Sequence, residues 1–165
     1  MLAHGSRQLR SWLIFSDLAM EDTFTHPKLG VMFPEDTDWI ASEAKVPFAA
    51  SPIEVCLCGE EGAAGPSQEA LVAYDWLSSH WADVFRLIEG QAFAFYEPYR
   101  DAVSSVPEFA SPHLLLGTEE VCGVRVRSKD DFEISLRIAW QEAEDPHVIT
   151  FYVEDGQCLT HSVDG

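Results

Sequence analysis

The sequence predicts an α+β protein, with an antiparallel β-meander first, a central helical region next and antiparallel hairpins last. Three observations support this fold class. Short segments broken by proline and aspartate fill the first third, an apolar stripe with helical spacing fills the middle, and alternating apolar and polar residues fill the last third. Single strands and helices do not alternate along the chain, so we expect no parallel βαβ unit.

The meander is expected from three candidate strands at 29–33, 39–46 and 53–59. Turn-forming residues separate them, namely Pro34, Asp36, Asp38, Pro47 and Pro52. Because side chains alternate along a strand, Glu54, Cys56 and Cys58 are expected on the face opposite to Val55 and Leu57.

The central region predicts one amphipathic helix, or two. A Gly-rich linker at 59–67 precedes the first helix, and Pro66 suits its start because first-turn N–H groups have no intrahelical partner. The apolar stripe consists of Leu71, Tyr74, Leu77, Trp81, Phe85 and Ile88. Gly90 is placed to cap this helix. Residues 91–106 favour a second helix, which Pro98 could start and which should end before Pro107.

The last third predicts hairpins that pack one face on the helix. Cys122, Val124 and Val126 are expected to share one face, followed by a polar turn at 128–131. The next inward-facing residues are Phe132, Ile134, Leu136 and Ile138, with Glu133, Ser135 and Arg137 facing outward. The pair Asp155-Gly156 is typical of a type I′ turn that joins a strand at 147–154 to a strand reaching His161.

Length and hydropathy predict a single domain over 20–165, preceded by an N-terminal extension or short docking helix at 1–19. The apolar run at 12–15 is shorter than the core of a signal peptide, which needs about 7 to 15 residues. A start at Met20 is the other interpretation of this segment. No stretch reaches the roughly 20 apolar residues that span a bilayer, so a cytoplasmic location is expected.

Charge is the most unusual property of the composition. The chain has 28 acidic and ten basic residues, a formal charge of -18, yet 47% of it is hydrophobic and can form a core. Such a charge disfavours nucleic acid and anionic membranes as partners. Lys and Arg are absent from 46–85 and from 138–165, and each stretch carries six acids. We therefore expect a negative surface near the C-terminal hairpin.

Motifs of catalysis and metal binding are not found. The sequence has no G-x-S-x-G, S-x-x-K, Walker or G-x-G-x-x-G pattern, and its six histidines are isolated. The four cysteines are expected to be reduced and mostly buried, including the pair Cys56 and Cys58. Paired carboxylates could perform acid/base chemistry, but 28 acids offer many accidental pairs. We expect no cofactor and no metal.

One constellation is typical of a partner-binding surface, because aromatic residues stand beside acids with no cations nearby. It consists of Trp140, Glu142, Glu144, Asp145, His147 and Tyr152. Tyr152 would belong to it if it faces outward with Thr150 and His161. The other interpretation is that Trp140 and Tyr152 are sheet residues of the core and that the acids only solubilise the chain.

Four segments resemble a family of uncharacterised acidic bacterial proteins with a domain of unknown function, some of which are grouped with immunity-type proteins of toxin systems. The segments are HPKLG at 26–30, Trp39, GPSQEALVAY at 65–74 and AWQEAEDPHVITFYVEDG at 139–156. The resemblance covers roughly 24–165. It implies an α+β, non-enzymatic, cytoplasmic protein and supplies no catalytic residues.

Two functional hypotheses of different classes follow, and a third is weaker. The first is a non-enzymatic interaction or inhibitor protein, immunity-like, that binds a basic protein partner. The second is a small hydrolase or cation-dependent enzyme that uses carboxylates with His147 or His161. The third is a structural subunit that assembles through Trp and Phe surfaces. The sequence does not fix the oligomeric state.

Overall fold

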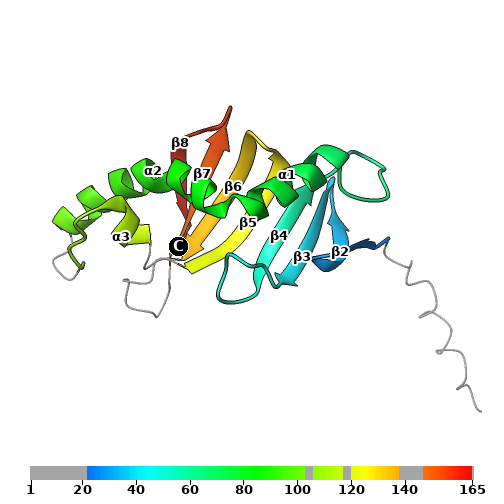
Figure 1. Cartoon of the computed structure of the whole chain (residues 1–165), viewed down its shortest axis with the longest axis horizontal. Coiled ribbons are helices and arrows are strands. Elements are labelled where there is room, and N and C mark those ends of the chain that lie inside the picture. The colour runs from blue at the N-terminus through cyan, green and yellow to red at the C-terminus, as the bar shows by residue number, and fades with distance from the viewer. Residues whose placement is uncertain (1–21, 103–105, 117–119, 138–146, 165) are drawn as a thin grey trace, which may run out of the picture.

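Eight strands form one sheet in chain order in the computed structural model, which describes residues 22–102, 106–116, 120–137 and 147–164 (Figure 1). The strands are β1 Phe24–His26, β2 Gly30–Glu35, β3 Asp38–Ala44, β4 Ile53–Cys58, β5 Glu120–Ser128, β6 Asp131–Arg137, β7 Val148–Glu154 and β8 Gln157–Asp164. The helices are α1 Gln68–Ser79, α2 Trp81–Ala102 and α3 Pro112–Leu116. The α+β class with a mostly antiparallel sheet and central helices is confirmed. The predicted N-terminal extension at 1–19 lies outside the described residues.

The first part of the sheet is the expected antiparallel meander, with β1 as an additional strand. A turn at residues 27–29 joins β1 to β2. His26 is buried, and its Nδ1 accepts hydrogen bonds from the backbone N–H groups of Lys28 and Leu29, both at 3.2 Å. The HPKLG segment is therefore a hairpin turn held by an imidazole.

The expectation that no parallel unit occurs was wrong at one place. Strands β4 and β5 pair in parallel, with Glu54 beside Gly123 and Cys56 beside Arg125. Parallel neighbours need a long crossover, usually helical, and the connection that carries α1, α2 and α3 supplies it. A single crossover leaves no repeated alternation in the sequence, so the pattern that signals βαβ units did not appear.

The helical region consists of two long helices that meet at His80, so the predicted end at Gly90 was wrong. The His80 carbonyl accepts N–H bonds from Asp83 and Val84, at 2.9 and 3.0 Å, and so starts α2 directly. Gly90 is exposed inside α2, where buried Ile88 and Ala92 on either side hold the helix against the sheet. Pro98 also lies inside α2 instead of starting a helix, while the predicted helix after 91 is confirmed.

The core lies between the helices and one face of the sheet. In Figure 1, α1 lies across β4 and β5, and α2 lies across β7 and β8. The sheet contributes buried apolar residues from four adjacent strands, among them Leu57, Val126, Ile134 and Phe151, while α1 and α2 contribute Tyr74, Leu77, Ile88 and Tyr96. In the part of the chain that the structure describes, no helix is long and apolar enough to cross a membrane.

The two C-terminal hairpins follow the predicted pattern except at Cys122. Phe132, Ile134 and Leu136 are buried, and Asp155 and Gly156 both have positive φ, as a type I′ turn requires. A register shift between Val121 and Gly123 interrupts the alternation in β5, so Val121 is buried while Cys122 is half-buried. The prediction that Cys122 faces the core with Val124 and Val126 was therefore wrong. Ile138 lies outside the described residues.

The second face of the sheet is polar, and no described helix packs on it. We call it the open face, and it carries Ile40, Cys56, Arg125, Glu133 and Tyr152 in one row across β3 to β7. Each residue of the row is the register partner of the next residue in the row, which lies on the adjacent strand. Residues that are far apart in sequence therefore form one continuous surface.

Candidate functional site

The open face contains a cleft of about 490 Å³ over β3, β4, β5 and β6. We call it the acidic cleft, because among the described residues five carboxylates line it and Arg125 is the single basic residue. The carboxylates belong to Glu35, Asp36, Asp38, Glu54 and Glu133. Their sequence positions span about 100 residues, and the parallel pairing of β4 with β5 brings them together.

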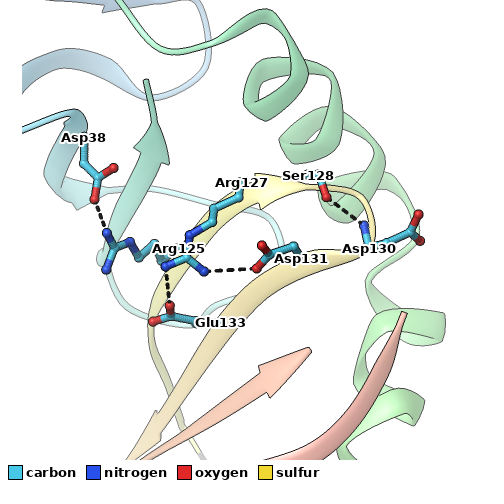
Figure 2. A network of polar contacts seen from close by, with 7 residues as sticks. All are labelled: Asp38, Arg125, Arg127, Ser128, Asp130, Asp131 and Glu133. Atoms are coloured by element: carbon cyan, nitrogen blue, oxygen red, sulfur yellow. Dashed lines mark hydrogen bonds and ion pairs between the residues drawn. The ribbon is translucent and has the colours of Figure 1, made fainter. Parts of the chain in front are cut away.

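Arg125 is already neutralised within the cleft. It forms an ion pair with Asp38, whose side chain is only 13% exposed (Figure 2). Burial lowers the pKa of Arg125, but hydrogen bonding to Cys58 and the charge of Asp38 outweigh burial and raise the pKa of this guanidinium overall. Arg125 therefore stays charged and engaged, and it offers little attraction to a further anion.

Arg127, two residues after Arg125 on β5, is also held by carboxylates. Its guanidinium lies 3.0 Å from Asp131 Oδ1 and 3.1 Å from Glu133 Oε1. Figure 2 marks both contacts with dashed lines. Glu133 thus lines the cleft with its charge compensated. Exposed ion pairs contribute little to stability, about 0 to 1 kcal/mol each. The main effect of these pairs is therefore on charge, because they neutralise some carboxylates and leave others without a cation.

Three carboxylates of the cleft are uncompensated. Glu35, Asp36 and Glu54 are exposed, and none of them forms an ion pair within the described residues. Glu35 ends β2, Asp36 stands in the turn to β3, and Glu54 stands on β4. The cleft therefore has a surplus of negative charge on two of its sides.

Gly123 makes the floor of the cleft. It pairs with Glu54 on β4 and with Ser135 on β6, so a side chain here would stand in the middle of the cleft. A Cβ built at Gly123 would meet no heavy atom closer than 3.7 Å, and the backbone there is not in the left-handed region. The space exists because this position has no side chain.

An apolar strip adjoins the cleft. Phe33 pairs with Ile40, which itself lines the cleft, and Val31 stands on the same face two residues earlier. The exposed fractions of Val31 and Phe33 are 50% and 47%, which is high for large apolar side chains on one strand. Apolar surface beside charged groups is typical of interfaces with proteins.

Cys56 lines the cleft, whereas Cys58, two residues further along β4, does not. Burial raises the pKa of Cys56, and Asp38 raises it further. Burial also raises the pKa of Cys58, so both thiols are protonated at neutral pH and are poor nucleophiles. All four cysteines are free, as expected, although only Cys56 is fully buried. In the described ranges no three His, Cys, Asp or Glu side chains converge in a way that could hold a metal ion.

Only two of the six residues predicted to bind a partner, His147 and Tyr152, lie in the described part of the chain. Trp140, Glu142, Glu144 and Asp145 lie outside the described residues, so their place in a surface stays a prediction. Tyr152 lies on the open face beside Glu133, and its hydroxyl is 2.9 Å from Ser162 Oγ. Thr150 shares this face and is 2.9 Å from Ser135 Oγ. His147 is half-buried just before β7.

His161 does not join Tyr152 and Thr150. Its Nδ1 accepts a hydrogen bond from Gln91 Nε2 at 2.8 Å, and its ring packs edge-on against Phe95 of α2 at 5.4 Å. The side chain therefore lies on the helical side of the sheet. The expectation that His161 faces outward with Tyr152 was wrong, because β8 pairs His161 with the core residue Phe151.

A family model described as a domain of unknown function, DUF6985, matches residues 29–152, well over half of the chain. The chain belongs to the DUF6985 family. The matched segment includes every residue of the acidic cleft. This confirms the resemblance to uncharacterised proteins, but the DUF6985 match contains no link to immunity proteins. No curated protein and no solved structure matches the chain.

The acidic cleft was missed at the sequence level, although one signal pointed to it. Gly123 interrupts an otherwise alternating strand, and an isolated glycine in a strand often marks a bulge or a close approach by a ligand. Asp38 was interpreted only as a turn residue. Its role depends on Arg125, which is 87 residues away in sequence.

Proposed function

We propose that this DUF6985 protein is a non-enzymatic interaction protein that binds a basic protein partner through the open face. The observation that carries the proposal is the acidic cleft, where, among the described residues, the guanidinium of Arg125 is paired and three carboxylates are not. Such a surface attracts cations and repels anions. Complementary charge mainly accelerates encounter and selects partners, while adjacent apolar contacts slow dissociation.

The finer form of the proposal is inhibition. A nuclease-like or other cationic toxin has a basic cleft that an immunity-like protein can cover with carboxylates and aromatic side chains. In the present chain, Glu35, Asp36 and Glu54 supply carboxylates, and Phe33 and Tyr152 supply aromatic side chains on the same face. The family match does not bear on inhibition, which rests on charge and shape alone.

The hydrolase hypothesis receives no support from the described residues. His161 is hydrogen-bonded to Gln91 on the helical side of the sheet, away from the acidic cleft. Among the described residues, the cleft lining contains one thiol, that of Cys56, which is protonated, and no histidine. We therefore put forward no second function.

Affinity capture with a matched pair of variants tests the proposal. The cleft variant Glu35→Gln/Asp36→Asn/Glu54→Gln removes the three uncompensated carboxylates. The control variant Glu69→Gln/Glu97→Gln/Glu108→Gln removes three exposed acids that lie outside the open face and form no ion pair within the described residues. Both variants change the net charge by the same amount.

Wild-type protein and the control variant are expected to retain the same strongly basic protein from an extract of the native host at physiological salt. The cleft variant is expected to retain at least tenfold less of it. If no retained protein is basic, or if all three baits retain it equally, the proposed function is wrong.

A further inference from the structure

We infer that the acidic cleft and the apolar strip together dock an extended segment of the partner. In this segment one Lys or Arg side chain enters the cleft over Gly123, and an apolar side chain three to four positions away covers Val31 and Phe33. The inference rests on the proposed function and specifies its chemistry. It names the part of the partner that is recognised.

Space for a long side chain is present only because of Gly123. The residues on either side of it in the sheet, Glu54 and Ser135, carry side chains that form walls, whereas Gly123 leaves the backbone bare between them. A cationic head group over Gly123 would lie between Glu54 on one side and the paired Glu133 on the other. The cleft volume of about 490 Å³ accommodates more than one side chain.

The charge of the cleft lining determines that the side chain entering the cleft is a cation. In the part of the lining that the structure describes, Arg125 is the only basic residue, and it forms an ion pair with Asp38. Glu35, Asp36 and Glu54 have no such partner in the described chain, so a cation gains attraction from three carboxylates. A second copy of this chain does not fit, because two molecules with a formal charge of -18 repel each other.

The apolar strip distinguishes a peptide from a small polycation. Phe33 on β2 is separated from Glu54 on β4 by one intervening strand. With strands about 4.8 Å apart and a rise of about 3.3 Å per residue, Phe33 stands roughly 10 to 12 Å from Glu54 and roughly 16 Å from Gly123 on the next strand, β5. An extended peptide spans the first distance in three to four residues, and the length of a Lys or Arg side chain covers the remainder to Gly123. A polyamine would leave Val31 and Phe33 uncovered.

The test uses synthetic peptides with blocked termini and the full chain at physiological salt. The probe peptide is a decapeptide with Leu three positions before Lys in a Gly-Ser background. The comparison ligands are the same peptide with Lys replaced by Gln, the same peptide with Leu replaced by Ser, and spermidine. Dissociation constants are measured by calorimetry or fluorescence.

The probe peptide is expected to bind at least tenfold more tightly than each comparison ligand. Gly123→Val is expected to weaken probe binding at least tenfold, because its side chain fills the floor, while Gly123→Ala has a smaller effect. Glu54→Gln leaves the floor intact and removes one carboxylate, and it is expected to weaken binding threefold or more. Circular dichroism and thermal unfolding verify that each variant is folded, and Glu54→Gln keeps the test valid if Gly123→Val does not fold.

Equal binding of the Lys and Gln peptides, or binding that Gly123→Val and Glu54→Gln leave unchanged, overturns the inference. Spermidine binding as tightly as the probe peptide overturns it too, in favour of a small-polycation site. Capture of a basic protein that survives Gly123→Val and Glu54→Gln refutes this docking mode while the proposed function stands. Failure of wild-type protein to capture any basic protein refutes the proposed function.

Discussion

At the scale of single residues, the open face depends on which charges are compensated. Arg125 is held by Asp38 of β3, and Arg127 is held by Asp131 and Glu133 of β6. Among the described residues, no cation pairs with the exposed side chains of Glu35, Asp36 and Glu54. The binding properties proposed for the protein therefore come from three acids out of the 28 in the chain.

A titratable residue with a structural role, His26, ends β1 just before the turn to β2. Burial lowers the pKa of His26. The negative charge of Asp75 partly raises this pKa again, and the positive charge of Lys28 lowers it. The unfolded chain then binds more protons than the folded one below about pH 6.5, so His26 stabilises the fold above that pH and the contribution is lost as pH falls. Protonation would also remove the Nδ1 acceptor for Lys28 and Leu29.

We predict that His26→Asn reduces the loss of stability between pH 7.5 and pH 5.5. Asparagine does not titrate, and its side-chain oxygen can accept the same two N–H bonds, as in an Asx turn. Urea unfolding of both proteins at the two pH values measures the effect. An equal pH dependence of wild type and variant would show that His26 does not titrate as described.

At the scale of elements, β6 shows why some segments are predictable from sequence. Phe132, Ile134 and Leu136 alternate with Glu133, Ser135 and Arg137, and burial follows this order. The break at His80 and the shift near Cys122 were not predictable in the same way. Both arise because packing against other elements outweighs the local pattern, as it does at Gly90, where a helix continues through a residue that costs about 1 kcal/mol relative to alanine.

The segment after α2 is fixed by one side chain. Tyr96 is fully buried in α2, and its hydroxyl donates to the Pro107 carbonyl at 2.7 Å and accepts from the Phe109 N–H at 2.8 Å. These two bonds tie the chain between α2 and α3 to the helix. Loss of the hydroxyl leaves two backbone groups without this partner.

We predict that Tyr96→Phe lowers the free energy of unfolding by about 1 to 3 kcal/mol, because partly buried polar groups lose their hydrogen bonds. Tyr152→Phe is the matched control. Within the described residues its hydroxyl bonds to the Ser162 hydroxyl alone, which can turn to water, so a smaller loss of about 0.5 to 1 kcal/mol is expected. Denaturant unfolding compares the two variants, and equal losses would refute the role given to Tyr96.

At the scale of the whole molecule, helices cover one face of the sheet (Figure 1), and none of the described helices packs on the open face. The fold class and most strands followed from periodicity and turn residues. The site did not, because Asp38, Glu54 and Arg125 become neighbours only through the parallel pairing of β4 with β5. Local patterns do not specify which strands adjoin. The predicted cluster around Trp140, Glu142, Glu144 and Asp145 stays a prediction beside the acidic cleft.

The central claim is that a basic segment binds on the open face, and an amide shift map measures this most directly. The ¹⁵N-labelled chain is titrated at physiological salt with the decapeptide that carries Leu three positions before Lys. We predict that the perturbed amides cluster in β2, the β2–β3 turn, β4 and β5 around Gly123. Perturbations centred on α1 and α2, or spread evenly over the surface, would contradict the account.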